Sequence, residues 1–139
     1  MDNRETVPGY KVYLDPETGE QPPLHVAFLG IRPDPDEHVS GVTVEVTGDE
    51  LAVLDARERN YDRHDVTELV DADIDGRVWT YVGSAAGRQR LATGRAHGTA
   101  VVSEGYLEGV RRGMAALGLR DELPLDLPVV PLLRRDVGA

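Results

Sequence analysis

The spacing of apolar residues along the chain predicts several short strands. In 41–46, Val42, Val44 and Val46 alternate with small or polar residues, a period of two that is typical of a half-buried strand. Asp75-Gly76 between two apolar runs indicates a hairpin turn. The predicted strands cover residues 10–14, 24–31, 41–46, 63–72 and 77–83.

Between the third and fourth predicted strands the pattern changes to a helical one. Thr47-Gly48-Asp49-Glu50 has the form of a capping box, with Thr47 as N-cap and Glu50 three residues later. Leu51 and Leu54 follow on one helical face. Asn60 is predicted to close this short helix in a left-handed conformation.

The second half of the chain contains one more predicted helix and a long apolar tail. Ser103 can cap this helix and Gly118 can end it. Its predicted buried face carries Tyr106, Leu107, Val110, Met114 and Leu117. Residues 84–98, rich in glycine, alanine and arginine, are predicted to be a loop and the most mobile internal segment. The tail, with three prolines among leucines and valines, should be extended and packed on the body.

The chain is of single-domain length, and we interpret residues 1–139 as one domain. Predicted strands outnumber predicted helices, and the helices interrupt the strands rather than alternating with them. This order predicts an α+β fold: an antiparallel-rich sheet or small barrel with helices outside it.

Composition excludes several classes of function. Twenty-five acidic against fifteen basic residues give a formal charge of −10, which disfavours nucleic acid and anionic membranes as partners. The chain has no cysteine, which excludes disulfides and thiolate chemistry, and its four histidines lack metal-ligand spacing. We expect no metal site. No apolar run approaches the roughly 18 residues of a membrane helix, and the polar start predicts a cytoplasmic protein.

Glu58 is the main candidate for chemistry. Seven steps of about 100° return it close to the direction of Leu51, so its carboxylate points along the apolar face of its own helix. Burial there raises the pKa of a carboxyl group and suits a general acid/base. The alternative is a structural carboxylate at a fraying helix end, paired with an arginine such as Arg63.

Leu54-Asp55-Ala56-Arg57-Glu58 matches the Leu-Asp-x-x-Glu element of the gamma-glutamylcyclotransferase-like family, which the chain resembles from residue 8 onward. The continuation through Asn60-Tyr61-Asp62-Arg63 is similar to bacterial members. Ser103-Glu104-Gly105-Tyr106 resembles the Ser-x-x-Tyr that opens the late helix of the family. The resemblance implies a small mixed β-barrel with flanking helices.

The resemblance also implies a reaction that needs no cofactor. A small-molecule γ-glutamyl amide or amine cyclises to 5-oxoproline and releases the amine. Glu58 would be the catalytic acid/base, and Tyr106 would contact the substrate. Tyr106 has an equal alternative as a core residue, since it shares a helical face with Leu107 and Val110. A non-catalytic ligand-binding or interaction domain of the same fold is the alternative function.

The chain departs from the family pattern at its start. Members begin with a strand and a Tyr-Gly-Ser or Tyr-Gly-Thr loop whose amides hold the γ-glutamyl group. Tyr81-Val82-Gly83-Ser84 has an extra residue and follows Glu58, so we do not assign it that role. We therefore expect a chain that lacks this first strand and loop, turns over substrate weakly, and forms a homodimer through an exposed sheet edge.

Two further interpretations concern arginines. Tyr61 and Arg63 are expected to pin the helix to the following strand. Arg88, Arg90 and Arg95 form a basic island in an acidic chain. They could attract a substrate carboxylate, but a solvated loop is the preferred interpretation.

Overall fold

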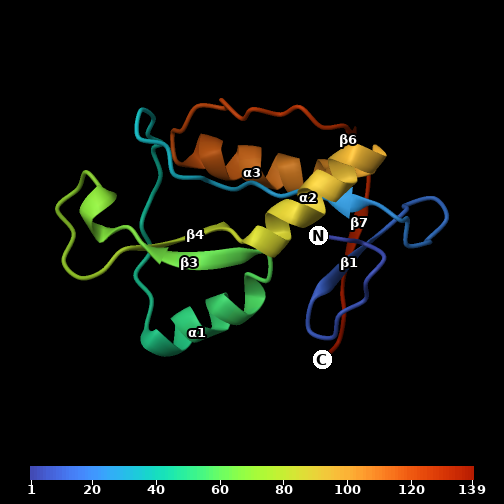
Figure 1. Ribbon diagram of the computed structural model, residues 1–139, viewed down its shortest axis with the longest axis horizontal. Helices are drawn as coiled ribbons and strands as arrows, with labels where there is room; N and C mark the ends of the chain where they lie inside the picture. Colours follow the sequence, from blue (N-terminus) through green and yellow to red (C-terminus); the bar gives the residue numbers. More distant parts are fainter. The chain divides into compact units, whose positions relative to one another are not determined.

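Three α-helices and seven short strands make up the fold in the computed structural model, which describes residues 1–139 (Figure 1). The helices are α1 (Gly48–Arg57), α2 (Ala85–His97) and α3 (Glu104–Ala116). The strands are β1 (Lys11–Leu14), β2 (His25–Val26), β3 (Tyr61–Asp65), β4 (Trp79–Gly83), β5 (Ala100–Ser103), β6 (Val129–Val130) and β7 (Leu133–Asp136). No helix is long and apolar enough to cross a membrane.

The strands form three small sheets rather than a closed barrel. β1 pairs with β7 and β3 pairs with β4, both antiparallel, whereas β5 lies parallel between β2 and β6. The mixture of helices and sheets confirms the α+β expectation. The barrel expected from the resemblance is not formed, because the largest sheet has three strands and its two outer strands, β2 and β6, do not pair with each other.

The chain divides into two compact units, Met1–Phe28 with Gln89–Ala139, and Leu29–Arg88. The first unit holds the buried apolar residues Val12, Tyr13, Val26, Ala100, Val101, Val102 and Leu107. α3 follows β5 directly and turns Leu107 inward, with Tyr106, Val110 and Met114 half-buried beside it, as predicted. Leu117 is an exception, since it is exposed. The tail is extended and paired through β6 and β7, as predicted.

Asn3 is a buried polar residue that the sequence pattern does not reveal. Its side-chain amide donates to the carbonyl oxygens of Tyr13 and Pro22 at 2.8 and 2.9 Å. Its Oδ1 accepts the Tyr13 N–H at 2.8 Å. The Asn3 backbone N–H also donates to Leu24 O at 2.8 Å. Asn3 therefore joins β1 to the segment that leads into β2.

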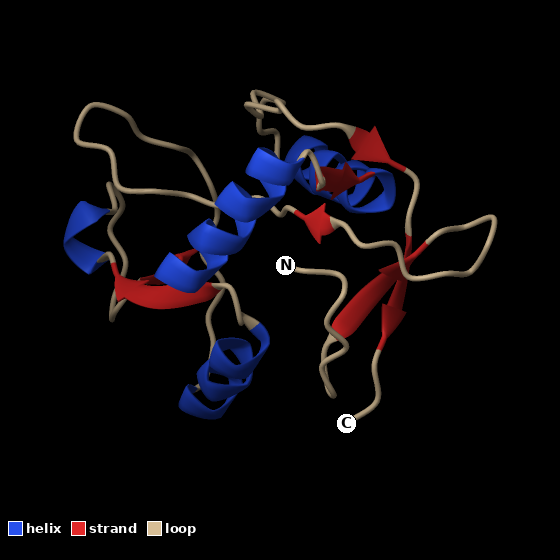
Figure 2. Cartoon of the chain, turned by 45° about the vertical axis from the view of Figure 1, so that its right-hand side comes forward, coloured by secondary structure: helices blue, strands red, loops and turns tan.

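Helix α2 occupies Ala85–His97, so the prediction of a loop at 84–98 is wrong (Figure 2). Alanine, glutamine, arginine and leucine favour a helix, and the Ser84 hydroxyl accepts the Gly87 N–H at 3.0 Å as a cap. The glycines that suggested flexibility serve other purposes. Gly98 has φ 68° and ends the helix. Gly94 lies where a Cβ would come within 2.6 Å of His25 Cβ.

Gly94 and Gly113 should respond oppositely to alanine. Gly94→Ala should destabilise the protein by about 1–3 kcal/mol, because the new methyl would overlap the buried His25 side chain. Gly113 lies on α3, where an added Cβ would meet nothing within 4 Å, so Gly113→Ala should stabilise by about 0.5–1 kcal/mol. Urea unfolding of both variants measures the difference. Equal shifts in one direction would contradict close packing at Gly94.

In the unit Leu29–Arg88, β3 and β4 form the predicted antiparallel pair. Arg63 lies opposite Tyr81, and Asp65 opposite Trp79. The predicted bounds are wrong, however. The connection runs from 66 to 78, contains a 3₁₀ turn at Thr67–Leu69, and includes Gly76 with φ 92°. Asp75-Gly76 is thus a bend within a long connection, not a two-residue hairpin loop.

Of two other predicted strands, the one at 24–31 is shortened and the one at 41–46 is absent. Only His25–Val26 of 24–31 forms a strand, and 41–46 forms neither a strand nor a helix. Val42 and Val44 are 60% and 77% exposed. No backbone hydrogen bond joins 41–46 to another segment. Alternating valines favour an extended backbone, but a strand also needs a neighbouring strand to pair with, and the chain supplies none here.

Candidate functional site

Glu58 stands at the end of α1, where the helix turns into β3 (Figure 1). The capping box begins this helix as predicted, with Glu50 N–H donating to Thr47 Oγ1 at 3.2 Å and Thr47 N–H to Glu50 Oε2 at 2.7 Å. The helix ends at Arg57, with Glu58 as its C-cap. The prediction that Asn60 closes it in a left-handed conformation is wrong, because only glycines have positive φ.

The Glu58 side chain lies on the apolar face of its helix, as predicted. From Gly48 to Glu58, only Leu51, Leu54 and Glu58 are half-buried, and every other residue is exposed. The Glu58 N–H donates to Leu54 O at 2.9 Å, and its carbonyl oxygen accepts the Tyr61 N–H at 3.1 Å. The backbone of Glu58 is therefore held on both sides.

Arg63 does not pair with Glu58, because it binds Asp55 instead. Arg63 Nε lies 3.2 Å from Asp55 Oδ1, and the Tyr81 hydroxyl donates to the same oxygen at 2.7 Å. The Arg63 guanidinium also lies 4.5 Å from the centre of the Trp79 ring, within cation–π range. Within Leu29–Arg88, no basic side chain forms an ion pair with the Glu58 carboxylate.

The segment after Glu58 is held by the start of α2. Ser84 N–H donates to Asn60 O at 2.9 Å. A Cβ at Gly87 would meet that same carbonyl oxygen at 2.4 Å, so only glycine allows the helix to approach this closely. Ser84 thus caps α2 and anchors Asn60, a role that sequence reasoning missed because it depends on a contact between distant segments.

The tyrosine and arginine expected to pin the helix act differently from one another. Arg63 connects α1 to the hairpin through Asp55, as expected. The Tyr61 hydroxyl instead donates to Leu29 O at 3.0 Å, and its ring lies 3.6 Å from where a Cβ would stand on Gly30. Tyr61 therefore packs β3 against the chain that enters this unit.

Tyr81 is the titratable group most changed by this cluster. Its partial burial, followed by its hydrogen bond to Asp55, raises the pKa of the Tyr81 hydroxyl from 10.0 to about 12. The negative charge of Glu58 contributes in the same direction.

This shift predicts how stability depends on alkaline pH. A folded-state pKa above the unfolded one stabilises the fold below about pH 10, and that stabilisation disappears as pH rises toward about 12. Tyr81→Phe lacks this contribution. The difference in unfolding free energy between wild type and Tyr81→Phe should be constant up to about pH 9 and then shrink. Urea titrations at several alkaline pH values measure it, and a difference that is independent of pH would contradict it.

Tyr106 belongs to the other compact unit. Its ring meets the edge of Phe28 at a centroid distance of 5.1 Å and an interplanar angle of 87°, and Phe28 in turn lies 6.2 Å from Tyr13. The ring is half-buried. Glu58 belongs to the unit Leu29–Arg88, whereas Tyr106 belongs to the unit formed by Met1–Phe28 and Gln89–Ala139.

The predicted basic island lies on α2, not on a loop. Arg95 forms two hydrogen bonds of 2.9 Å with the carboxylate of Asp126. Arg88 donates to the Gly83 carbonyl oxygen. These two arginines therefore have structural partners within the protein, which weakens the idea of a substrate-attracting island.

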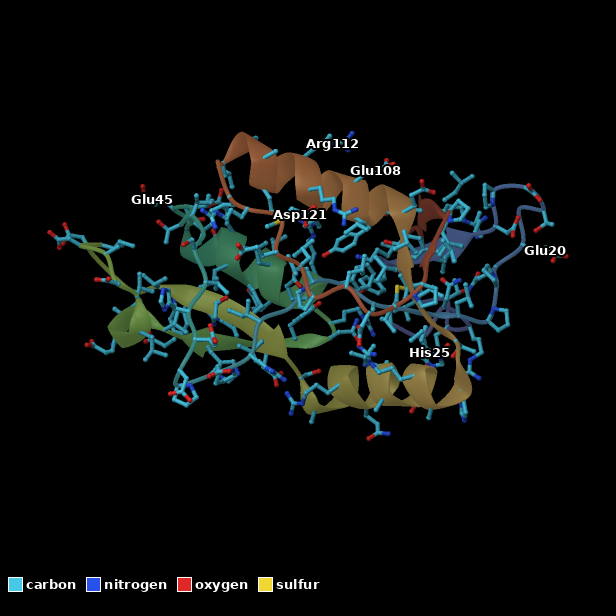
Figure 3. The ribbon with its side chains drawn as sticks, turned by 90° about the horizontal axis from the view of Figure 1, so that it is seen from above. Glu20, His25, Glu45, Glu108, Arg112 and Asp121 are labelled. Carbon is cyan, nitrogen blue, oxygen red and sulfur yellow. The ribbon has the colours of Figure 1, made fainter.

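His25 is a second buried polar residue that sequence reasoning missed (Figure 3). Its Nδ1 lies 2.8 Å from Thr99 Oγ1, and its Nε2 lies 3.7 Å from Asp2 Oδ2. Burial lowers the pKa of His25 below its ordinary value. No group of three or more His, Asp or Glu side chains is arranged to hold a metal ion. His25 is therefore a hydrogen-bonded core residue.

A family model described as "Gamma-glutamyl cyclotransferase, AIG2-like" matches residues 2–100, more than half of the chain. The matched range includes Glu58 and the whole Asp55–Arg63–Tyr81 cluster, and it ends before Tyr106. Neither curated proteins nor solved structures gave a significant match.

Proposed function

Because this chain belongs to the gamma-glutamyl cyclotransferase, AIG2-like family, we propose that it converts a γ-glutamyl amide or amine to 5-oxoproline and a free amine. The substrate's own α-amine attacks its γ-carbonyl carbon. A carbon–nitrogen bond forms within the new ring, and the bond to the leaving amine breaks. The nucleophile is tethered to its target, so holding the substrate in the reactive geometry supplies several kcal/mol of the barrier reduction.

Glu58 is the proposed acid/base. Its carboxylate accepts a proton from the attacking α-amino group and returns one to the departing amine, so that one residue serves both steps. The substrate therefore loses no net proton, and neither an oxidant nor a cofactor is required. The resemblance assigns this role to the glutamate of the Leu-Asp-x-x-Glu element, which is Glu58 here.

The observation that carries the proposal is the environment of Glu58. It is half-buried on the apolar face of α1 and has no basic ion-pair partner in its unit, whereas Asp55 on the same helix is engaged by Arg63 and Tyr81. A salt-bridged carboxylate is held in its charged form and exchanges protons poorly. Glu58 forms no such salt bridge within its unit.

We also propose that Tyr106 contacts the bound γ-glutamyl compound. Its ring is fixed against Phe28, which would present the phenol in a defined direction. Tyr106→Phe should then raise KM while largely sparing kcat. An unchanged KM would assign Tyr106 to the core alone.

The proposal is tested by incubating the purified chain with γ-glutamyl dipeptides and γ-glutamyl alkylamines and measuring 5-oxoproline. The matching α-glutamyl dipeptides serve as controls, because their side-chain carboxyl carries no leaving amine. Release from the γ-linked compounds alone supports the reaction. Binding of these compounds by calorimetry without release would instead favour a non-catalytic ligand-binding domain.

A further inference from the structure

Helix α1 has little apolar surface with which to hold its place. None of its residues is buried, and only Leu51 and Leu54 are half-buried. Hydrophobic stabilisation scales with the apolar area removed from water, so two partly covered leucines fix the helix weakly. A side chain at its end needs another anchor to keep one orientation.

Asp55 supplies a polar anchor near the end of the helix. It is the α1 side chain bonded to the hairpin, accepting the Tyr81 hydroxyl at 2.7 Å and pairing with Arg63 Nε at 3.2 Å. Tyr81 and Arg63 are directly opposite each other on β4 and β3, so they present their side chains on one face of the hairpin. Trp79, two residues before Tyr81, lies on that same face and stacks on Arg63.

We propose that Tyr81 is a positioning residue for Glu58, acting through its hydrogen bond to Asp55. Asp55 precedes Glu58 by three residues, about one helical turn, so fixing Asp55 fixes the turn from which the Glu58 side chain projects. Asn60, two residues after Glu58, is held by Ser84 and Gly87. Glu58 is therefore restrained on both sides. The catalytic consequence of this inference rests on the proposed function, but the structural part does not.

Amide hydrogen exchange tests the structural part without any substrate. Tyr81→Phe should speed exchange of the Glu58 N–H, which donates to Leu54 O, by about three- to tenfold. The expected effect is modest because Asp55 is 39% exposed and keeps Arg63. The Leu51 N–H, which donates to Thr47 O at the start of α1, is the internal control and should not change. Unchanged exchange at Glu58, or equal acceleration at Leu51, would overturn the inference.

Kinetics test the catalytic consequence. Tyr81→Phe should lower kcat for 5-oxoproline release by about tenfold with little change in KM, because Glu58 acts on the bound substrate. Combining Tyr81→Phe with Asp55→Ala should lower kcat no further than Asp55→Ala alone, since the two residues act through one contact. Arg77→Gln is the matched control. It removes the Arg77–Asp65 pair from the same hairpin without touching α1.

The outcomes separate the two proposals. A wild-type chain that releases no 5-oxoproline refutes the proposed function, and the exchange of the Glu58 N–H then decides alone whether Tyr81 positions the helix end. Faster exchange at Glu58 with an unchanged kcat refutes Tyr81 as a positioning residue for catalysis. Loss of activity in both Tyr81→Phe and Arg77→Gln would point to general damage to the hairpin and would equally refute it.

Discussion

Replacing Glu58 by glutamine should lower 5-oxoproline release by about 10²–10⁴-fold, the usual cost of losing a general acid/base. Glutamine keeps the length and shape of the side chain, and the half-buried position at the end of α1 has room for it without a broken ion pair. The amide cannot take a proton from the attacking amine or return one to the leaving group. The rate constant kcat should therefore fall while the unfolding midpoint stays nearly constant.

The control for this change is Glu45→Gln, a substitution of an exposed glutamate in the same unit (Figure 3). It removes one negative charge from the acidic surface and should leave kcat as it is. If Glu58→Gln retains wild-type kcat, Glu58 is not the acid/base. If Glu45→Gln loses as much activity as Glu58→Gln, the effect belongs to net charge and not to proton transfer.

Asn3→Ala should cost about 3 kcal/mol or more of unfolding free energy, the largest stability effect we expect from a single substitution. The truncation removes three hydrogen bonds of 2.8–2.9 Å from a fully buried side chain. It leaves the N–H and the carbonyl oxygen of Tyr13 without their partner, whereas Pro22 O keeps the Leu24 N–H. Each buried unsatisfied group costs about 1–3 kcal/mol. Urea unfolding followed by circular dichroism measures the loss.

Asn3→Asp separates hydrogen bonding from simple loss of volume. Aspartate fills the same space, but a carboxylate oxygen would face the carbonyl oxygens of Tyr13 and Pro22 where the amide now donates. Protonation of that carboxyl group restores one donor. Asn3→Asp should therefore be destabilised at neutral pH and recover part of its stability, relative to wild type, in mild acid. An Asn3→Ala chain as stable as wild type would remove Asn3 as the link between β1 and the β2 segment.

Local signals predicted those parts of the fold that depend on neighbouring residues. The capping box at Thr47 and Glu50 formed as expected because its hydrogen bonds span three residues. α3 also begins after Ser103 as predicted, although the Ser103 side chain makes no capping hydrogen bond there. The strand predicted at 41–46 failed because pairing requires a partner elsewhere in the chain. The loop predicted at 84–98 failed because Gly87 and Gly94 allow close packing, a property that only the folded structure reveals.

The same distinction, between local signals and contacts of distant segments, applies to the candidate site. The face on which Glu58 lies follows from helical periodicity alone, so sequence reasoning identified it. The sequence pattern does not reveal the role of Tyr81, because its hydrogen bond to Asp55 spans 26 positions. Buried His25 and Asn3 have no periodic signal, because each is a polar residue whose partners lie in distant segments. A motif therefore indicated Glu58, the proposed acid/base, but not the residues that contact its helix.

The pairing of β1 with β7 sets an order of events during synthesis. Lys11 lies opposite Asp136, so β1 can pair only after every residue up to β7 has been synthesised. The unit Leu29–Arg88 is continuous in sequence and can fold while it emerges, whereas the unit built from both chain ends cannot. Val12 and Tyr13 therefore lack their β7 partners until those residues have been made. Closure of this long-range contact is expected to be the slow step in folding.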